Sequence, residues 1–391
     1  MRLHRLILFV LLLATSCNQQ DRSNENAIDE FIEQKMQDSG LVGLATGILV
    51  DKKLVWAKGY GFADRENAVP FTTSTIMNIA SITKTFTGAL VMKAVEENKI
   101  SLDEDINKYL PFKVINPYFP ETKITLRHLA THTAGIADRS PVYDGSYYYG
   151  GDYPDPLGVF LRDYFSPDGK YYSKENFLNA RPGSRNSYSN IGAGLAGYIV
   201  EESTGKKLFE YSKENIFAPL GMNNTCWRLS DVKASLHSKL YDQKGDSIKL
   251  IPWYGLATYP DGGVRTSVSD LSKFLICLVN EGQSDGGQVL KKESVQEMTR
   301  PQFNESNKPD SLDLSKGNEG IFWWISQDGK EGHDGGDPGV MTNMWYDTRR
   351  NIGVIMFTNT TPKNGSKHFM SLDSALWIFA QHLKDNASKS N

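Results

Sequence analysis

The sequence predicts an α+β fold: one antiparallel sheet, built from both ends of the chain and flanked by helices, joined to a mainly helical lobe. Three observations support this prediction. Strand-like runs occur near the start of the chain, further strand-like runs occur in its last quarter, and helical patterns fill the part between them. The simplest arrangement pairs the terminal runs in one sheet, so a cleft should lie between this sheet and the helical lobe.

The N-terminal segment is expected to lie outside this fold. Residues 1–17 have a basic start, an apolar stretch and then small residues before Cys17, and they resemble a bacterial lipoprotein signal with Cys17 as the lipidated residue. An ordinary secretory signal is the alternative. Residues 18–26 would form a polar tether. Both alternatives place the protein outside the cytoplasm, in the cell envelope, and the lipid would anchor it to a membrane.

The first folded elements are a helix, a hairpin and a second helix. Residues 25–38 carry apolar side chains on one helical face, and residues 43–62 form two β-rich runs around a polar tip. A helix-period pattern over residues 81–97 begins at Ser81. The folded part is expected to be a single domain over residues 27–385.

The middle of the chain predicts helices and one long excursion. The excursion covers residues 138–176, is rich in tyrosine between 143 and 172, and shows few periodic signals before LGVFLRDYF. Such a loop is either a decorated surface loop or a functional one that shapes a substrate entrance. Helices are expected over residues 190–206, 207–222, 269–280 and 291–299.

The end of the chain returns to strand-like runs. These are IFWWISQDG, GVMTNMWYD and NIGVIMFTNT, which turn signals separate. A final helix is expected over about 367–384. The sheet would therefore use approximately residues 27–75 and 320–385, and the helical lobe approximately 76–319.

The composition narrows the possible functions. The net charge is −3, so no nucleic-acid footprint is evident. Beyond the N-terminal segment only Cys226 and Cys277 remain, which is too few for a disulfide framework, and Cys277 lies in an apolar run and is expected to be a buried thiol. We expect a monomer that needs no metal and no cofactor.

Ser81 and Lys84 are the first candidate catalytic pair. Three residues separate them at the start of a helix, so both side chains lie on one face about a turn apart. A serine hydroxyl becomes a nucleophile when a neighbour takes its proton, and a lysine can do this, or can help by its field, if burial or nearby positive charge lowers its pKa. The alternative is a helix-capping serine beside an exposed lysine.

Two later segments offer partners for Ser81. Tyr188 and Asn190 stand two residues apart at a loop-to-helix junction, where a tyrosine held among cations can act as a general base and an asparagine can bind a substrate amide. The alternative is a core tyrosine and a helix-capping asparagine. Downstream, the turn Gly332-His333-Asp334-Gly335-Gly336 lies between strand-like runs. Its glycines, including Gly335, would let substrate approach the backbone, and His333 could bind a substrate carboxylate or acyl oxygen, or tune Tyr188.

With these three motifs in this order, the chain resembles the serine β-lactamase and penicillin-binding protein superfamily. It is most similar to the branch that holds class C β-lactamases, D-alanyl-D-alanine carboxypeptidases, D-aminopeptidases and β-lactamase-like esterases. The motifs of that family are S-x-x-K, Y-x-N and K-T-G or H-x-G, and here they read Ser81-Ile82-Thr83-Lys84, Tyr188-Ser189-Asn190 and His333-Asp334-Gly335. The resemblance covers roughly residues 27–385 and implies a β-lactamase/transpeptidase-like fold with the active site in the cleft.

The resemblance also implies roles for the residues. Ser81 would be the acylated nucleophile, Lys84 would assist its deprotonation, and Tyr188 would be the general base and then the acid for the leaving group. Asn190 would orient the substrate. The backbone N–H groups of Ser81 and Gly336 would form the oxyanion hole. The substrate would be a small-molecule or peptide ester or amide.

One departure from the family pattern bears on the substrate. His333 stands where many β-lactamases carry lysine, which favours a peptidase or esterase over a dedicated β-lactamase. A protein that binds or senses cell-wall peptides or β-lactams without catalysis is the alternative function.

Two other catalytic motifs are weaker. The letters G-x-S-x-G occur at residues 282–286, but in a polar turn after a helical run, so we interpret them as a chance match. His128 and His132 have the spacing of a zinc-binding H-E-x-x-H motif, but position 129 is leucine. We expect these histidines to support the loop near Ser81.

Overall fold

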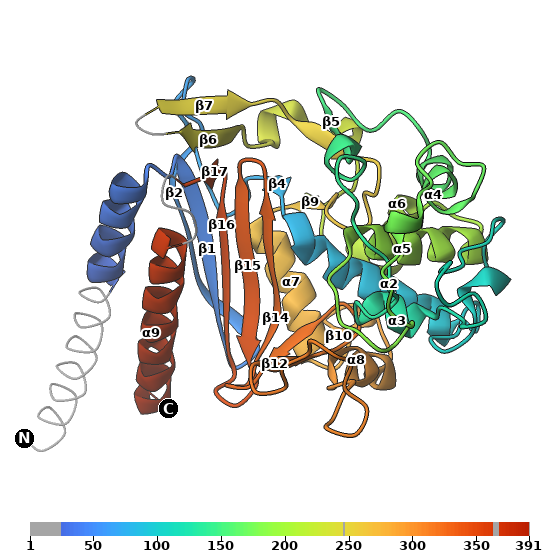
Figure 1. Ribbon diagram of the computed structural model, residues 1–391. Helices are drawn as coiled ribbons and strands as arrows, with labels where there is room; N and C mark the ends of the chain where they lie inside the picture. The colour runs from blue at the N-terminus through green and yellow to red at the C-terminus, as the bar shows by residue number, and fades with distance from the viewer. Residues whose placement is uncertain (1–24, 245–246, 363–366, 391) are drawn as a thin grey trace, which may run out of the picture.

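The centre of the fold is a sheet that joins the two ends of the chain. The computed structural model describes residues 25–244, 247–362 and 367–390. Eight antiparallel strands run in the order β12-β13-β14-β15-β16-β1-β2-β3 (Figure 1). β1 (Gly43–Val50) lies between β2 (Lys53–Asp64) and β16 (Ile352–Thr358), and every residue of β1 and β16 is buried because helices cover both faces of the sheet. The predicted fold class is confirmed.

The outer face of the sheet is covered by the terminal helices. The N-terminal helix spans residues 25–39 and α9 spans Lys367–Ser390, and Figure 1 shows both beside the same face. Ile32 from the first helix and Leu372 and Leu376 from α9 are fully buried in one apolar cluster with the sheet. Each helix has an apolar residue at every third or fourth position. These residues form one apolar stripe, and this stripe packs on the sheet.

The opposite face packs on helices that lead into the lobe. α7 (Val268–Val279) lies against the sheet, and α2 (Thr83–Glu96) runs through the interior beside α5 (Asn190–Thr204). Phe86 of α2 stacks on Phe274 of α7 with ring centroids 3.9 Å apart, so the sheet side and the lobe share one core. The division into sheet residues and lobe residues therefore stays a prediction.

The remaining elements are short. The other sheet strands are β3 (Val69–Pro70), β12 (Gly317–Glu319), β13 (Trp324–Ser326), β14 (Lys330–Asp337) and β15 (Val340–Asp347). Small separate sheets pair β4 (Met77–Asn78) with β9 (Arg265–Thr266), β5 (Tyr147–Tyr149) with β8 (Tyr254–Leu256), β10 (Gln283–Ser284) with β11 (Gly287–Gln288), and β6 (Leu240–Lys244) with β7 (Ser247–Ile251) and β17 (Thr360–Thr361). The further helices are α3 (Leu126–Ala130), α4 (Leu157–Phe165), α6 (Leu208–Ser212), α8 (Lys292–Thr299) and the π-helical turn η5 (Lys213–Phe217). Single 3₁₀ turns are η1 (Ala80–Ile82), η2 (Ile106–Lys108), η3 (Asp144–Ser146), η4 (Lys174–Asn176), η6 (Leu229–Asp231) and η7 (Ala234–Leu236).

Two segments differ from their predicted form. The segment at residues 332–336, expected as a turn, lies within the strand β14, which pairs with β15 along its whole length. The excursion at residues 138–176 is more ordered than its sequence suggests, because it contains α4 and the strand β5. Tyr164 is fully buried, while Tyr148 and Tyr149 are about half exposed. Part of the excursion is therefore packed into the core of the fold, and part of it lies at the surface.

The expected signal over residues 1–17, its lipidated Cys17 and most of the tether lie outside the described residues, so they stay predictions. Within the described ranges, the helices are too short or too polar to span a bilayer. Cys226 and Cys277 are both free, and Cys277 is buried as predicted.

Candidate active site

Ser81 lies where the sheet meets the lobe. It belongs to η1, which runs directly into α2. The preceding residue, Ala80, is buried and has a φ of 47°, a left-handed conformation that alanine rarely adopts. The carbonyl of Ile79 accepts a hydrogen bond from Thr342 Oγ1 of β15 at 2.9 Å. The sheet therefore holds a strained turn in place just before Ser81, a kind of strain that is common at functional sites.

Lys84 is fully buried one helical turn after Ser81. Its Nζ donates to Ser81 Oγ at 3.1 Å, to Asn190 Oδ1 at 2.6 Å and to the backbone carbonyl of Asp261 at 2.9 Å, so all three ammonium protons have acceptors. Burial acts to lower the pKa of Lys84, but the neighbouring oxygens of Tyr188 and the charge of Asp261 outweigh it and hold this pKa above its ordinary value. Lys84 is therefore a cation at neutral pH and acts through its charge.

Tyr188 joins Ser81 and Lys84 in one cluster. Its hydroxyl interacts with both side chains, and its ring centroid lies 4.8 Å from Lys84 Nζ and 4.3 Å from the His132 ring centroid. Burial of the hydroxyl raises the pKa of Tyr188, and the Lys84 charge offsets this only in part. The residue as a whole is 46% exposed and lines the cleft cavity described below, so Tyr188 faces the cleft.

Asn190 is held in place by a residue that the sequence motifs do not include. Asp138 accepts hydrogen bonds from the backbone N–H of Asn190 at 2.7 Å and of Ile191 at 2.9 Å, and from Ser189 Oγ at 2.9 Å. A carboxylate is favoured there because the first N–H groups of a helix lack intrahelical acceptors. Ser189, rather than Asn190, is the helix cap. Asn190 is therefore free to turn its side chain toward Lys84.

The strand β14 forms the other wall of the site. β13 pairs only with Glu331 and Gly332 of β14, so the strand has a free edge from His333 onward. A Cβ atom on Gly335 would lie 2.5 Å from the carbonyl of Ile79, whereas one on Gly336 would meet no atom within 4 Å. Gly335 therefore lets β14 approach η1 closely enough to place Ser81 beside the free edge.

The backbone of Gly336 is oriented toward this edge. Asp337 and Val340 close a two-residue turn, so this pair exchanges hydrogen bonds within the hairpin of β14 and β15. The alternation of an antiparallel ladder then directs the N–H of Gly336 away from β15. Ser81 lies in the first turn of its helix, where N–H groups lack intrahelical acceptors. Both N–H groups are thus left without the usual helix or ladder acceptor, and their role as oxyanion-hole donors stays a prediction.

His333 is a neutral side chain in this site. Its Nδ1 lies 2.5 Å from the carbonyl oxygen of Asp334, which can only accept, so Nδ1 carries the proton and Nε2 is left as an acceptor. Burial, together with the charge of Lys84, lowers the pKa of His333 to about 4. Burial also lowers the pKa of His132 well below its usual range, and its Nδ1 accepts from the Ser189 N–H at 3.2 Å. Neither histidine supplies a positive charge at neutral pH.

Several buried acids lie around the cluster, and sequence reasoning did not identify them. Burial raises the pKa of Asp261 to about 8 and that of Glu319 to about 8. Asp337 ends the free edge of β14, and Tyr147 of the excursion donates to its Oδ1 at 2.6 Å. Among the described residues no donor reaches Asp337 Oδ2, and burial raises the pKa of this carboxyl to about 6. No local motif marks these acids, because their surroundings come from distant segments.

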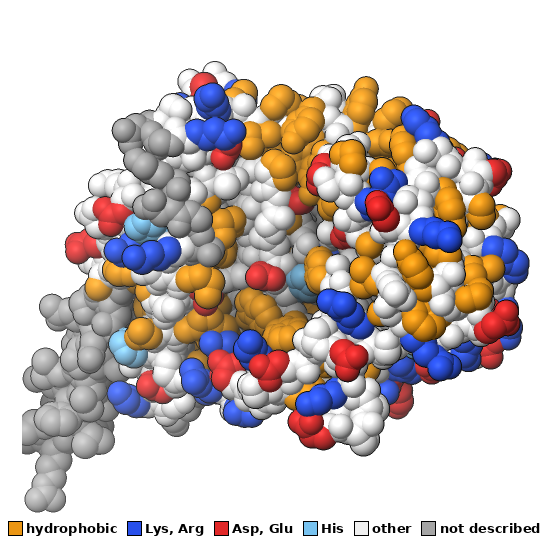
Figure 2. Space-filling model, viewed as in Figure 1, with side chains coloured by type: hydrophobic (Ala, Val, Ile, Leu, Met, Phe, Trp, Pro, Cys, Tyr) orange, Lys and Arg blue, Asp and Glu red, His pale blue; other side chains and the backbone are white. Residues whose placement is uncertain are grey.

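A cavity of about 380 Å³ opens beside Tyr188 and His333. Its lining consists of two histidines, two carboxylic acids, three tryptophans, a phenylalanine, an asparagine and a tyrosine. Figure 2 shows the hollow between the sheet side and the lobe side of the molecule, with acidic and histidine side chains inside it. Of the predicted site residues, Tyr188 and His333 line this cavity, and Ser81 and Lys84 lie next to Tyr188.

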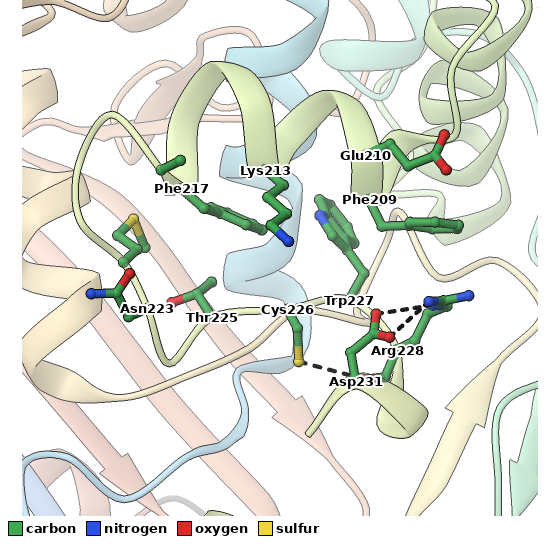
Figure 3. A pocket seen from close by; sticks show the side chains of 12 residues that line it. Phe209, Glu210, Lys213, Phe217, Asn223, Thr225, Cys226, Trp227, Arg228 and Asp231 are labelled. Atoms are coloured by element: carbon green, nitrogen blue, oxygen red, sulfur yellow. Dashed lines mark hydrogen bonds and ion pairs between the residues drawn. The ribbon is translucent and has the colours of Figure 1, made fainter. Parts of the chain in front are cut away.

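A larger cavity of about 650 Å³ lies on the lobe, and it shares no lining residue with this cleft (Figure 3). Its thiol, Cys226, contacts the carbonyl of Arg228 at 3.5 Å, and burial raises the pKa of Cys226 to about 12. Arg228 is paired with Asp231 at 2.7 Å. This cavity thus lacks the activated nucleophile that the cleft contains.

The two weaker motifs have other positions in the fold. The serine of the G-x-S-x-G match, Ser284, lies in the hairpin of β10 and β11 and donates to the carbonyl of Gly287, so it is not on a strand-to-helix elbow. His128 closes a capping box with Thr125 at the start of α3, whereas His132 packs on Tyr188. Of the described residues, no three His, Cys, Asp or Glu side chains are grouped so that they could hold a metal ion.

Comparison with known proteins gives a consistent result. The sequence pattern of the Beta-lactamase family matches residues 28–375. Beta-lactamase-like protein 2 of Dictyostelium discoideum is 28% identical over 76% of this chain and 54% of its own length, and the chain spans about half the length of the curated relatives it matches. The octameric penicillin-binding protein homologue of Pyrococcus abyssi is 27% identical, with a TM-score of 0.70 over 85% of this chain and 73% of that one. The D-amino acid amidase of Ochrobactrum anthropi is 22% identical and shares the fold, with a TM-score of 0.71 over 93% of this chain and 99% of that one.

Proposed function

The chain belongs to the beta-lactamase family, and from this premise we propose that it is a serine hydrolase that cleaves an ester or amide through an acyl-enzyme intermediate. The observation that carries the proposal is the cluster in which Lys84 donates to Ser81 Oγ at 3.1 Å while the Tyr188 hydroxyl contacts both. A nucleophile, a cation and a proton-transfer group thus meet in one open cleft. This is the arrangement that nucleophilic catalysis requires.

In the first step, Ser81 Oγ attacks the carbonyl carbon of the substrate. Its proton passes to the oxygen of Tyr188 while the proton of Tyr188 passes to the leaving group, so no ionised tyrosine has to accumulate. The N–H groups of Ser81 and Gly336 stabilise the negative charge that develops on the carbonyl oxygen. The leaving group departs as an alcohol or amine, and the acyl group stays on Ser81.

In the second step, water attacks the acyl carbon and the same groups act in reverse. Tyr188 accepts the proton of the water and returns a proton to Ser81 Oγ, which releases the acid. The buried ammonium of Lys84 stabilises negative charge on Ser81 and Tyr188 throughout. Asn190, whose Oδ1 accepts from Lys84, has its amide N–H₂ available to orient the substrate.

We favour a peptidase, amidase or esterase over a dedicated β-lactamase. His333 is neutral at neutral pH, whereas many members of the family carry a lysine at this position. The cleft therefore has one cation fewer for an anionic substrate. The catalytic cluster itself does not distinguish among these substrate classes, so the choice depends on the residues around it.

The experiment that tests the proposal is covalent labelling with a fluorescent fluorophosphonate. We expect the wild type to be labelled at Ser81 and the label to be lost in Ser81→Ala. Ser284→Ala is the matched control, because it removes the serine of the G-x-S-x-G match and should leave labelling unchanged. A wild type that takes no label, while folded by circular dichroism, would instead support a non-catalytic binding or sensing protein.

A further inference from the structure

The free edge of β14 carries an acidic side chain where it borders the cleft. Asp334 lines the cleft cavity, and its side chain is 79% exposed. Its carboxylate lies 3.9 Å from His333 Nδ1, and the His333 ring centroid lies 6.3 Å from that of Tyr188, so Asp334 is separated from the cluster by one side chain. The lining of this cavity, as far as the described residues form it, includes no lysine and no arginine. A substrate that extends along this side meets a negative charge.

The one cation of the catalytic cluster is not available to balance that charge. Lys84 is fully buried, and its three protons are already donated to Ser81, Asn190 and the carbonyl of Asp261. A buried ammonium with all its donors used stabilises groups inside the cluster. It cannot also form a hydrogen-bonded ion pair with a substrate carboxylate.

His333 cannot take over this role either. Its Nδ1 proton is directed to the carbonyl of Asp334, so the other ring nitrogen offers a lone pair. A lone pair accepts a proton from a hydroxyl or amide group and repels a carboxylate. His333 is thus suited to neutral hydrogen-bond donors on the substrate.

The opposite end of the free edge is acidic as well. Asp337 closes β14 three residues after Asp334, and Tyr147 satisfies one of its two carboxylate oxygens. A substrate lying along β14 therefore meets the exposed carboxylate of Asp334, while the carboxyl of Asp337 is buried at the other end of the edge.

Building on the proposed function, we propose that the cleft selects esters and amides without a carboxylate on the leaving group, and that Asp334 is the residue that sets this preference. A leaving group that is neutral or positively charged fits beside Asp334. One that ends in a carboxylate is repelled by Asp334 and finds no lysine or arginine in the described lining of the cavity. This would exclude peptides that end in a free D-amino acid, and it leaves amidase, aminopeptidase and esterase substrates.

The test compares two substrates that differ only in this charge. They are the phenylacetyl ester of glycolic acid and the phenylacetyl ester of glycolamide, each corrected for its uncatalysed hydrolysis rate. We expect kcat/KM for the glycolamide ester to be at least tenfold higher at low ionic strength, and the ratio to shrink with added salt. In Asp334→Asn we expect the ratio to fall by about fivefold or more, the size that one nearby surface charge gives.

Asp285→Asn is the matched control, because Asp285 lies in the β10–β11 hairpin and lines a cavity away from the cleft. It should leave the ratio unchanged. Equal or faster hydrolysis of the glycolate ester would overturn the inference while leaving the hydrolase intact. An unchanged ratio in Asp334→Asn would overturn the role of Asp334. Loss of both activities together with no labelling of Ser81 would overturn the proposed function, and the inference with it.

Discussion

Lys84 serves the structure and the chemistry at once. A charged group in the interior costs free energy unless it is fully paired, and Lys84 is paired by Ser81 of the preceding turn and by an asparagine and a carbonyl from two distant segments. The same ammonium fixes the positions of Ser81 and Asn190. Removal of Lys84 would therefore disturb the fold of the site as well as its electrostatics, which makes Ser81→Ala the cleaner test of catalysis.

Gly335 and Gly336 offer a matched test of the strand position. We expect Gly335→Ala to lose about 1–3 kcal/mol of unfolding free energy, because its Cβ would lie 2.5 Å from the Ile79 carbonyl and 2.5 Å from Thr342 Oγ1. Gly336→Ala should change this free energy by less than about 0.5 kcal/mol, because its Cβ points into open space. Urea unfolding measures both. Equal losses would show that β14 does not press on η1.

At the level of residues, the sequence identified the residues of the candidate catalytic cluster but not its surroundings. Ser81 and Lys84 are separated by one helical turn, so their proximity follows from local geometry alone. The positions of Asp138 and Glu319 depend on contacts across 52 and 133 residues of sequence, which no local pattern encodes. On the sequence alone, Lys84 needs a lowered pKa if it is to take the proton of Ser81. The pKa of Lys84 is instead raised, because Tyr188 and Asp261 pair with the ammonium more strongly than burial opposes it.

The N-terminus of α5 shows how one element positions two functional side chains. Tyr188 and Asn190 flank the helix cap, and Asp138 binds the first N–H groups of the helix. We expect Asp138→Ala to destabilise the protein by about 1–3 kcal/mol, since it removes a charged acceptor from buried donors. We also expect it to lower kcat/KM for a neutral ester by at least tenfold. Urea unfolding and steady-state kinetics measure the two effects.

The control for this prediction is Asp144→Ala. Asp144 is an exposed acid of the same excursion, and it bonds to Ser140 rather than to α5. It should leave stability and kcat/KM near the wild type. If Asp138→Ala behaves in the same way, the anchoring of α5 does not depend on this carboxylate.

At the level of elements, long periodic helices and apolar strands were predictable, whereas two functional strands were not. The central strands β1 and β16 have strongly apolar sequences. β14 contains three glycines and two aspartates, which have low intrinsic strand propensity, and only its pairing with β15 makes it a strand. β5 is likewise a strand because β8, about a hundred residues later, pairs with it.

The buried acids give the whole molecule a pH-dependent stability. Burial raises the pKa of Glu319 from 4.5 to about 8, so between these values the folded state keeps a proton that the unfolded chain releases. Its stabilising contribution is complete below about pH 4.5 and is lost as the pH rises through 8. Glu319→Gln cannot ionise. We expect the wild type to lose a few kcal/mol relative to this variant between pH 5 and pH 8, at about 1.4 kcal/mol for each unit of pKa difference.

Thermal unfolding at pH 5, 6.5 and 8 measures this difference, with the exposed Glu121→Gln as the control. Parallel curves for the wild type and Glu319→Gln would contradict the prediction, because they would mean that Glu319 is ionised to the same extent in the folded and unfolded states.

The pairing of β1 with β16 has a consequence for how the protein is made. β1 needs β16 as its neighbour, yet about 300 residues are synthesised between them. The sheet therefore cannot close until β16 has been synthesised, and the β1–β2 hairpin stays with one apolar edge unpaired until then. Contacts so distant in sequence slow folding and prolong exposure to aggregation. A chaperone that binds nascent chains would have to stay bound longest at this hairpin.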